Sequence, residues 1–471
     1  MSFKETIREI LKYIPTIKSP ERPLSFKERL FWTFLIICVY YLLTITPLFG
    51  LSKSYIQTHY FFASLLAASV GSIITLGIGP IITGHIILEI LVAGRTIPLN
   101  LRNPEDRRIF EGLAKIFAII FILIENFPWA FFTFPVEANH PEMLVRLIMY
   151  IQLVIGGLIL LYLDEICTKW GIGSGISLFI AAGVSKTLFI RAFNVIPDPS
   201  GVPVGAVPRI IYFLAKADFN SIVWPLFSII ATLLILVLST YLQAVRIELP
   251  FHLGRVGGRP IRWPISLLYT SNIPVIFTAA TIGTIQMMAT VLSRAGISIF
   301  GVVETVCEYG RCYPVPKSGL VKLLNPPTIQ QIYFKILGHT LTYYDILSIV
   351  FYLFVFIVFS AIFSYVWIYS AGQDPTSVAE QLLASGINLP GFRADKRILE
   401  RVLSRYIIPT TILGGILVGI LASLADIMGA LARGTSILLA VMILNNFYER
   451  LIKQHIHEIP IIRQFIKVEQ K

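Results

Sequence analysis

Ten runs of about 20 mostly apolar residues follow one another along the chain and constrain its fold more than any other feature. An α-helix rises about 1.5 Å per residue, so a run of this length spans the roughly 30 Å hydrocarbon core of a bilayer. We therefore expect an all-α polytopic membrane protein with ten transmembrane helices. The predicted spans are 30–50, 72–93, 112–134, 143–166, 173–193, 221–245, 272–292, 345–370, 407–428 and 434–452.

The composition agrees with a membrane protein. Of the 471 residues, 55% are apolar and only 14% are charged, whereas a soluble domain carries about 25% charged residues. The mean hydropathy is +0.76. The first residues, MSFKETIREILKYIP, are polar and amphipathic, which is not the pattern of a cleavable signal peptide.

Lysine and arginine predict the orientation. Basic residues gather in the cytoplasmic loops of membrane proteins. With the N-terminus in the cytoplasm, the cytoplasmic segments hold 26 of the 39 lysines and arginines and the opposite side holds 10. We expect both termini in the cytoplasm, and the net charge of +12 to mark mostly that face.

The spans divide into two halves of five. Spans 2 and 7 occupy the same place in each half, and both carry a proline, in GIGPII and SNIPVI. This faint pseudo-symmetry is typical of inverted repeats. The expected organisation is a cytoplasmic N-terminal segment (1–29), a first half (30–195), an external hinge loop (196–220), a second half (221–452) with cytoplasmic loops 246–271 and 371–406, and a cytoplasmic tail (453–471).

The second span, Ile73 to Leu91, contains Gly77, Gly79, Pro80 and Gly84. In a helix interior each glycine costs about 1 kcal/mol against alanine and a proline about 3 kcal/mol. Such a loss of helix propensity near the middle of a span calls for a functional explanation. The glycines would allow close helix contacts, and Pro80 would loosen the backbone.

Two further segments leave alternatives open. The apolar run from Tyr60 to Ser72 is too short to cross, so it is either re-entrant or interfacial. The cytoplasmic loops place Arg255, in LGRVGG, and Arg393, in PGFRADKR, at what the sequence indicates are turns. Such tips either dock on phosphate-rich or acidic partners or form a solvated face.

No motif for catalysis, cofactor binding or metal binding is visible in the sequence, and we expect none of these functions. An intramembrane protease would require a reactive Ser174, but no histidine or lysine is placed to activate it. A secondary transporter of small solutes is one functional class to weigh, and it would need a charged site at mid-membrane. Few ionisable residues lie there: His85 and Glu125 are the deepest, with Glu89 and Asp164 nearer the ends.

The four cysteines fall into two pairs. Cys38 and Cys167 lie in or beside spans, where cysteine behaves as a small apolar residue. Cys307 and Cys312, in VCEYGRCYP, fall on the external side, and Gly310 between them allows a tight turn. We predict a disulfide between these two, because that compartment is oxidising.

Four motifs together resemble the SecY family, the central subunit of the Sec protein-conducting channel. They are ITLGIGPIIT (74–83), YLDEICTKWGIGSGISLFIAAGVSKT (162–187), TSNIPVIFTAA (270–280) and GFRADKRILERVLSRYI (391–407). The second is most similar to the archaeal and eukaryotic branch. The resemblance covers nearly the whole chain.

The resemblance implies two halves of five helices that open around an hourglass pore. A short re-entrant helix near residues 60–71 would plug the external funnel. Spans 2 and 3 would part from spans 7 and 8 as a lateral gate. Unfolded polypeptides would cross through a ring of aliphatic side chains, while signal sequences and membrane helices would leave through the gate.

The resemblance also assigns residues. The gate's polar cluster falls on Thr83, Glu125 and Thr284, the last of which is often asparagine in relatives. Two pairs of the ring are spaced i,i+4, so each pair points one way from its helix. The ring falls on Ile78, Ile82, Ile176, Ile180, Ile276 and Leu439.

Partners and location follow from the same resemblance. The expected location is the cell membrane of a prokaryote of the archaeal type. One-span subunits of the SecE kind and the small beta kind would complete the complex. Ribosomal RNA or a cytosolic motor would dock at Arg255 and Arg393. The other partners are nascent chains, their signal sequences, the signal recognition particle receptor and the lipid bilayer. No cofactor is implied.

Overall fold

The structure, a computed structural model, covers most of the chain. It describes residues 9, 13, 15–51, 71–94, 96–99, 103–136, 141–197, 201–253, 260–268, 273–294, 296–308, 311–388 and 395–455. Apart from Gly71, the plug expected near residues 60–71 lies outside the described residues.

Five long helices form the first half of the chain. They are α2 (Phe26–Ile45), α4 (Gly79–Ala93), α5 (Pro104–Pro128), α6 (Glu142–Trp170) and α7 (Gly175–Phe193). A π-helical turn, η1 (Trp129–Thr133), extends α5. Side chains cap the N-termini of two of these helices. Ser25 and Glu28 form a capping box at the start of α2, and the Asn103 side chain accepts a hydrogen bond from the Glu105 N–H at the start of α5.

Five more long helices form the second half. They are α9 (Phe219–Ala244), α10 (Ile273–Arg294), α13 (Tyr343–Ser370), α15 (Lys396–Met428) and α16 (Gly434–His455). Four shorter helices lie in the connections: α8 (Ala206–Ala215), α11 (Leu320–Leu323), α12 (Ile329–Leu337) and α14 (Pro375–Ala384). The expected hinge loop 196–220 therefore contains a helix, α8.

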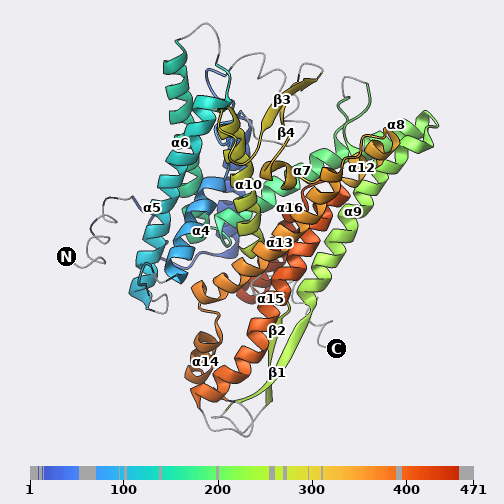
Figure 1. Cartoon of the computed structure of the whole chain (residues 1–471). Coiled ribbons are helices and arrows are strands. Elements are labelled where there is room, and N and C mark those ends of the chain that lie inside the picture. The colour runs from blue at the N-terminus through green and yellow to red at the C-terminus, as the bar shows by residue number, and fades with distance from the viewer. Residues whose placement is uncertain are drawn as a thin grey trace.

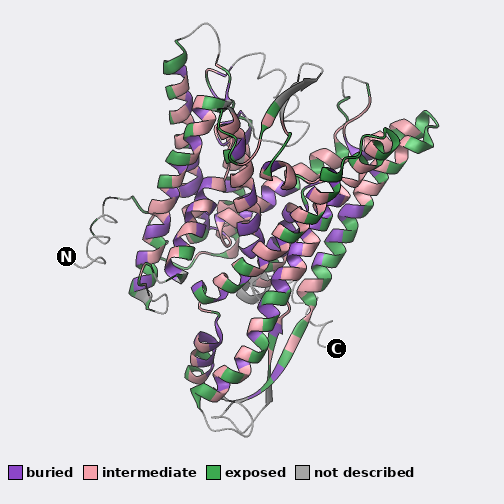
Figure 2. Cartoon of the chain, in the orientation of Figure 1, coloured by how far each residue is buried: buried purple, intermediate pink, exposed green. Residues whose placement is uncertain are grey.

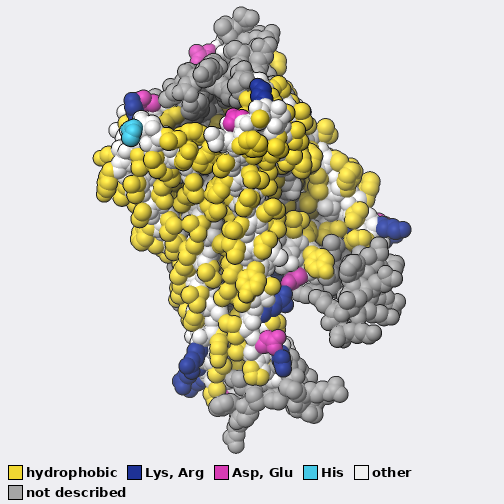
Figure 3. Space-filling model, turned by 90° about the vertical axis from the view of Figure 1, so that its right-hand side faces the viewer, with side chains coloured by type: hydrophobic (Ala, Val, Ile, Leu, Met, Phe, Trp, Pro, Cys, Tyr) yellow, Lys and Arg dark blue, Asp and Glu magenta, His cyan; other side chains and the backbone are white. Residues whose placement is uncertain are grey.

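The ten long helices coincide with the ten predicted spans. By length and composition, six of the described helices are long and apolar enough to cross a membrane, and α4 is among the shorter apolar helices. On the face in Figure 3, hydrophobic side chains cover the middle of the molecule, and charged side chains gather toward its two ends. This distribution is the one that a bilayer requires of a protein that spans it.

Each half has its own apolar core. In the first half, Ile36 of α2, Ile122 of α5 and Phe179 of α7 belong to one buried cluster. In the second half, Phe356 of α13 and Val418 of α15 belong to another. Figure 2 shows buried residues along α15 and exposed ones along α9, which borders the molecule.

Glycines bring helix backbones together inside each half. A Cβ added at Gly84 of α4 would lie 2.8 Å from the Ala118 nitrogen of α5. In the second half, a Cβ at Gly419 of α15 would lie 3.0 Å from the Ile357 Cα of α13. Among the glycines of the described helices, every such contact with another long helix joins helices of the same half.

A small antiparallel sheet, not expected from the sequence, lies at one end of the molecule (Figure 1). Its strands are β1 (Arg246–Leu253), β2 (Pro260–Ser266) and β5 (Ile387–Asn388), in the order β2-β1-β5. Phe251 and Ile265 are buried in a cluster with α14 and the start of α15. We call this the sheet end. A second hairpin, β3 (Val303–Glu308) and β4 (Arg311–Pro316), lies toward the opposite end.

The second span begins differently from the expectation. Helix α4 starts at Gly79, which places Pro80 in its first turn, where proline is tolerated because its missing N–H has no helical partner. Residues 73–78 form successive turns, with Gly77 N–H donating to Ile74 O at 2.9 Å and Gly77 at a φ of +55°. The expectation that Pro80 stands in a helix interior is wrong, because Pro80 is the second residue of α4.

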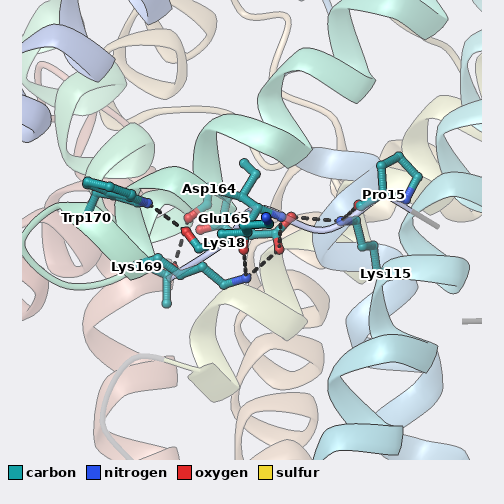
Figure 4. Close-up of polar contacts among 9 residues, drawn as sticks. Pro15, Lys18, Lys115, Asp164, Glu165, Lys169 and Trp170 are labelled. Carbon is teal, nitrogen blue, oxygen red and sulfur yellow. Dashed lines mark hydrogen bonds and ion pairs between the residues drawn. The ribbon is translucent and has the colours of Figure 1, made fainter. Parts of the chain in front are cut away.

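The chain before α2 is tied to the first half. Residues 15–18, the N-terminal strap, surround Glu165 of α6 (Figure 4). The Glu165 carboxylate accepts from Ile17 N–H at 3.0 Å and from Lys115 Nζ at 2.7 Å. Lys115 also donates to Pro15 O at 2.6 Å, and Lys169 Nζ donates to Glu165 at 2.8 Å. The strap thus links the middle of α5 to the last turns of α6.

Candidate functional site

The six aliphatic residues of the expected ring come from four helices. Ile78 caps the start of α4 and Ile82 follows one turn later, while Ile176 and Ile180 lie in the first two turns of α7. Five of the six pack in one cluster around buried Ile82; Leu439 of α16 belongs to the second-half core, against which Ile180 and Ile276 also pack.

This cluster lies where the two halves meet. Ile78 and Ile176 also pack on the core of the first half, and Ile180 and Ile276 pack on that of the second. The contacts that join the halves run from α4 to α10 and α13, and from α7 to α16. Aliphatic side chains of both halves therefore converge at one place.

Among the described residues, open space adjoins the cluster. A Cβ built at Gly77 or Gly79, on either side of Ile78, would meet none of the described atoms within 4 Å, and the same holds at Gly283 of α10. The expectation that Gly77, Gly79 and Gly84 all permit close helix contacts is therefore right only for Gly84. The other two border unfilled space instead.

Three aromatic residues of the second half complete the junction. Phe277 of α10 is buried, and its ring lies 5.7 Å from that of Phe363 and 6.1 Å from that of Trp367, both on α13. These rings belong to the cluster that holds Ile82 and Ile86 of α4. The seam between α4 and the two helices α10 and α13 is therefore made of apolar side chains. The sequence analysis did not identify the aromatic residues of this seam, although Phe277 follows Ile276 directly.

A carboxylate fixes the start of α7, and with it Ile176. Asp164 of α6 accepts from the Ile176 N–H at 2.8 Å. A Cβ at Gly175 would lie 2.5 Å from the Asp164 Cα, so the two backbones touch. The sequence interpretation noted Asp164 only as an ionisable residue near a span end. In the structure it positions one of the ring residues.

The polar residues assigned to the gate lie near the same seam. Thr83 of α4 is half-buried and donates to Gly79 O at 3.1 Å, and its side chain reaches the Glu125 carboxylate of α5. The other carboxylate oxygen, Glu125 Oε1, is buried without a hydrogen-bond partner among the described residues. Thr284 is half-buried on α10, which packs against α4.

Known proteins match this chain over nearly its whole length, including every helix that contributes to the cluster. A family model described as SecY matches residues 72–448. The protein translocase subunit SecY of Pyrococcus furiosus is 37% identical over 483 residues, covering 98% of this chain and 99% of its own length. That of Methanothermobacter thermautotrophicus is also 37% identical, covering 98% and 99%. This chain belongs to the SecY family.

Solved structures of SecY and Sec61 proteins have the same fold. One, described as a protein conducting channel, has a TM-score of 0.76 at 32% identity, over 96% of this chain and 97% of its own. A Sec61 structure in a canine ribosome-channel complex has a TM-score of 0.73 at 32% identity, over the same shares. The two-half architecture is therefore the SecY architecture, as the resemblance implied.

The two arginines expected to dock a cytoplasmic partner, Arg255 and Arg393, lie outside the described residues. The strands that carry their loops are described. β1 ends at Leu253, which pairs with Ile387 of β5. β5 ends one residue later, at Asn388. The loop that follows β1 and the loop that follows β5 therefore begin side by side at the sheet end.

The two external cysteines are backbone neighbours across a hairpin. Cys307 of β3 pairs with Cys312 of β4. Opposed antiparallel residues have Cα atoms about 4.5–5.5 Å apart, within the roughly 4.4–6.8 Å that a disulfide spans. The disulfide stays a prediction. Mass spectrometry of the non-reduced protein should detect the linked peptide, and two alkylatable thiols at these positions would contradict it.

Proposed function

We propose that this chain is the central subunit of a protein-conducting channel, through which unfolded polypeptides cross the cell membrane. The observation that carries the proposal is the aliphatic cluster of Ile78, Ile82, Ile176, Ile180 and Ile276, with Leu439 beside it, at the junction of the two halves. Relatives that match nearly the whole chain are translocase subunits, and one solved relative is described as a protein conducting channel.

The chemistry of these side chains suits such a pore. Branched aliphatic groups offer no hydrogen bond to a passing chain, so they close around it without holding it. A narrow apolar constriction also resists wetting, which keeps ions back. The mechanism needs no reaction at the ring, and energy for movement would come from a partner such as a translating ribosome.

The seam between α4–α5 and α10–α13 is the proposed exit for signal sequences and membrane helices. It is held by side chains such as Ile86 and Phe277, while the helices within each half touch through their backbones. Thr83, Glu125 and Thr284 would set how readily it opens. The carboxylate oxygen of Glu125 that lacks a partner among the described residues favours a polar contact once the seam parts.

The sheet end is the proposed cytoplasmic face. The loops with Arg255 and Arg393 leave from this end, and ribosomal RNA is the proposed contact. One relative with 32% identity was solved in a ribosome-channel complex. The signal recognition particle receptor would meet the same face, and the SecE-type and beta-type subunits would lie against the lipid-facing helices.

Residues near 60–71 are the proposed plug. One solved relative is described as a SecY protein whose plug domain stabilises the closed state of the translocation channel and maintains a membrane seal. In this chain the open space beside Gly79 and Gly283 is where such a segment would fit. The small-solute transporter finds no support in the relatives.

Cross-linking a nascent chain tests the function. Photoreactive residues placed at 78 and 276 of the reconstituted complex should cross-link to a stalled secretory chain. A photoreactive residue at 230, on the exposed side of α9 where Ile230 is 52% exposed, should not. Equal labelling at all three positions, or none at 78 and 276, would show that the chain does not pass through this cluster.

A further inference from the structure

A polar cavity of about 250 Å³ lies where the end of α7, from the first half, meets helices of the second half. Its other walls come from α10, α13, the end of α15, the start of α16 and the segment 324–328 between α11 and α12. Arg191, at the end of α7, and Arg433, just before α16, line it together with Asp426 of α15. We call this cavity the arginine pocket. It is large enough for a side chain with several waters, since a water occupies about 30 Å³.

The charges in the pocket do not balance. Two guanidinium groups face one carboxylate, and Arg433 lies close enough to act electrostatically on Arg191. Asp426 is already engaged: it accepts from the Tyr352 hydroxyl at 2.6 Å and from the Gly434 N–H at 2.6 Å. One positive charge therefore has no counterpart among the described residues that line the pocket.

One arginine also has a donor to spare. Arg191 Nη1 donates to Leu431 O at 3.2 Å, but its Nε is buried and has no hydrogen-bond partner among the described residues. A buried donor without a partner is unfavourable. Unmatched positive charge and a free buried N–H together favour an anion with oxygen acceptors, because arginine binds carboxylates and phosphates through parallel N–H donors.

The position of the pocket indicates where that anion comes from. On α10, Ala279 of the pocket lies one turn after Ile276 of the ring. On α16, Thr435 of the pocket lies one turn before Leu439. Both steps lead away from the sheet end, so the pocket lies just beyond the proposed ring for a polypeptide that enters from the sheet end.

We propose that the arginine pocket binds carboxylate side chains of the translocating polypeptide just after they pass the ring. This inference rests on the proposed function. Each bound aspartate or glutamate would hold the chain briefly and oppose backward sliding. The effect would be modest, because a partly exposed ion pair changes an equilibrium by about twofold to fivefold. It would weaken as salt is added.

The test measures backward sliding in vesicles that contain the whole complex. A secretory chain is arrested by a folded domain at its C-terminus, with four aspartates or four asparagines just beyond the ring. The rate at which each chain slides back is followed by loss of protease protection. In the wild type, the aspartate chain should slide back about twofold to fivefold more slowly. Arg191→Gln and Arg433→Gln should remove this difference.

Matched variants keep the result interpretable. Arg209→Gln is the control, because Arg209 lies on α8 and donates to Pro203 O at 3.0 Å, away from the pocket. It should keep the wild-type difference. Arg191→Lys retains the charge and should keep part of it. Arg433 is exposed, so Arg433→Gln tests the pocket even where Arg191→Gln does not fold.

Two outcomes would overturn the proposal. One is equal sliding of the two chains in the wild type, and the other is an unchanged difference in both glutamine variants. If sliding is equal and native mass spectrometry shows an anionic lipid that the wild type holds and Arg191→Gln loses, the pocket binds a lipid phosphate instead. If the wild-type complex does not translocate the asparagine chain either, the result contradicts the proposed function itself.

Discussion

At the scale of the residue, closure of the proposed ring depends on side chains that are large and apolar. Ile82 and Leu439 are buried, while Ile78, Ile176 and Ile276 are half-buried. The three half-buried side chains therefore pack against the protein on one side and stay accessible on the other. Removing volume here should open the constriction and weaken the contacts that keep it closed.

Replacing two ring residues by serine should produce a leak. Ile78→Ser with Ile276→Ser should give ion conductance without substrate in planar bilayers, and should let weaker signal sequences be translocated. The closed state should weaken by about 2 kcal/mol per site, the lower end for large buried residues, because the wall is only partly packed. The pair Ile90→Ser and Ile230→Ser, at exposed positions, should do neither. Equal behaviour of the two pairs would place the ring elsewhere.

Two glycines of α4 should respond oppositely to alanine. At Gly84 the added Cβ meets the backbone of α5 at 2.8 Å, and such overpacking typically destabilises by about 1–3 kcal/mol. At Gly79 the Cβ meets nothing within 4 Å. Thermal unfolding in detergent should show a lower midpoint for Gly84→Ala and little change for Gly79→Ala. The reverse order would mean that α4 and α5 pack differently.

The identity of the ring residues was beyond the reach of pattern alone. An isoleucine that faces a pore and one that faces lipid look the same in a sequence, so Ile276 could be assigned only by resemblance. The i,i+4 spacing of Ile176 and Ile180 shows that both lie on one face of their helix, but it does not show whether that face lines a pore. The sequence also could not show that Arg191 and Asp426 line the same pocket, because residues so far apart in sequence meet only through the fold.

At the scale of the element, the N-terminal strap makes a local and testable contact. The Glu165 carboxylate is largely buried and accepts from two lysines and from the Ile17 N–H. Hydrogen bonds to a charged group contribute about 1.5–3 kcal/mol each. The strap should therefore come loose when this carboxylate is removed.

Hydrogen exchange should report that release. In Glu165→Ala the Ile17 amide should exchange about tenfold faster or more, given the size of a charge-assisted hydrogen bond. Glu111→Ala is the control, since Glu111 forms only an exposed pair with Arg107 at 3.5 Å. Unchanged exchange at Ile17 in Glu165→Ala would show that other contacts hold the strap.

Long helices were more predictable than short elements. Apolar runs located all ten, because a span of about 20 apolar residues has few alternatives. The strands β1 and β2 were missed, although Ile247, Leu249 and Phe251 alternate with polar residues or proline. Prolines within both strands argued against a sheet. The start of α4 was misplaced for a related reason: Pro80 can stand in a first turn as well as break an interior.

At the scale of the whole molecule, docking should depend on the sheet end. Arg255→Glu and Arg393→Glu should weaken ribosome binding, and each should lower the slope of log affinity against log salt by about 0.7–0.9 if one phosphate contact is lost. Lys216→Glu makes the same charge change at the C-cap of α8, a helix that lies away from the sheet end in Figure 1, and it should leave binding unaltered. Normal binding by both arginine variants at every salt concentration would rule out this docking surface.

The glycine contacts have a mechanical consequence. Helices that touch backbone to backbone resist relative motion, whereas helices joined by side chains yield more easily. The molecule therefore behaves as two stiff shells joined along a compliant seam, from Ile82 and Ile86 to Phe277. Any strain that a passing chain or a bound ribosome imposes will concentrate in that seam, so stiffness alone directs the opening sideways toward lipid while each shell keeps its shape.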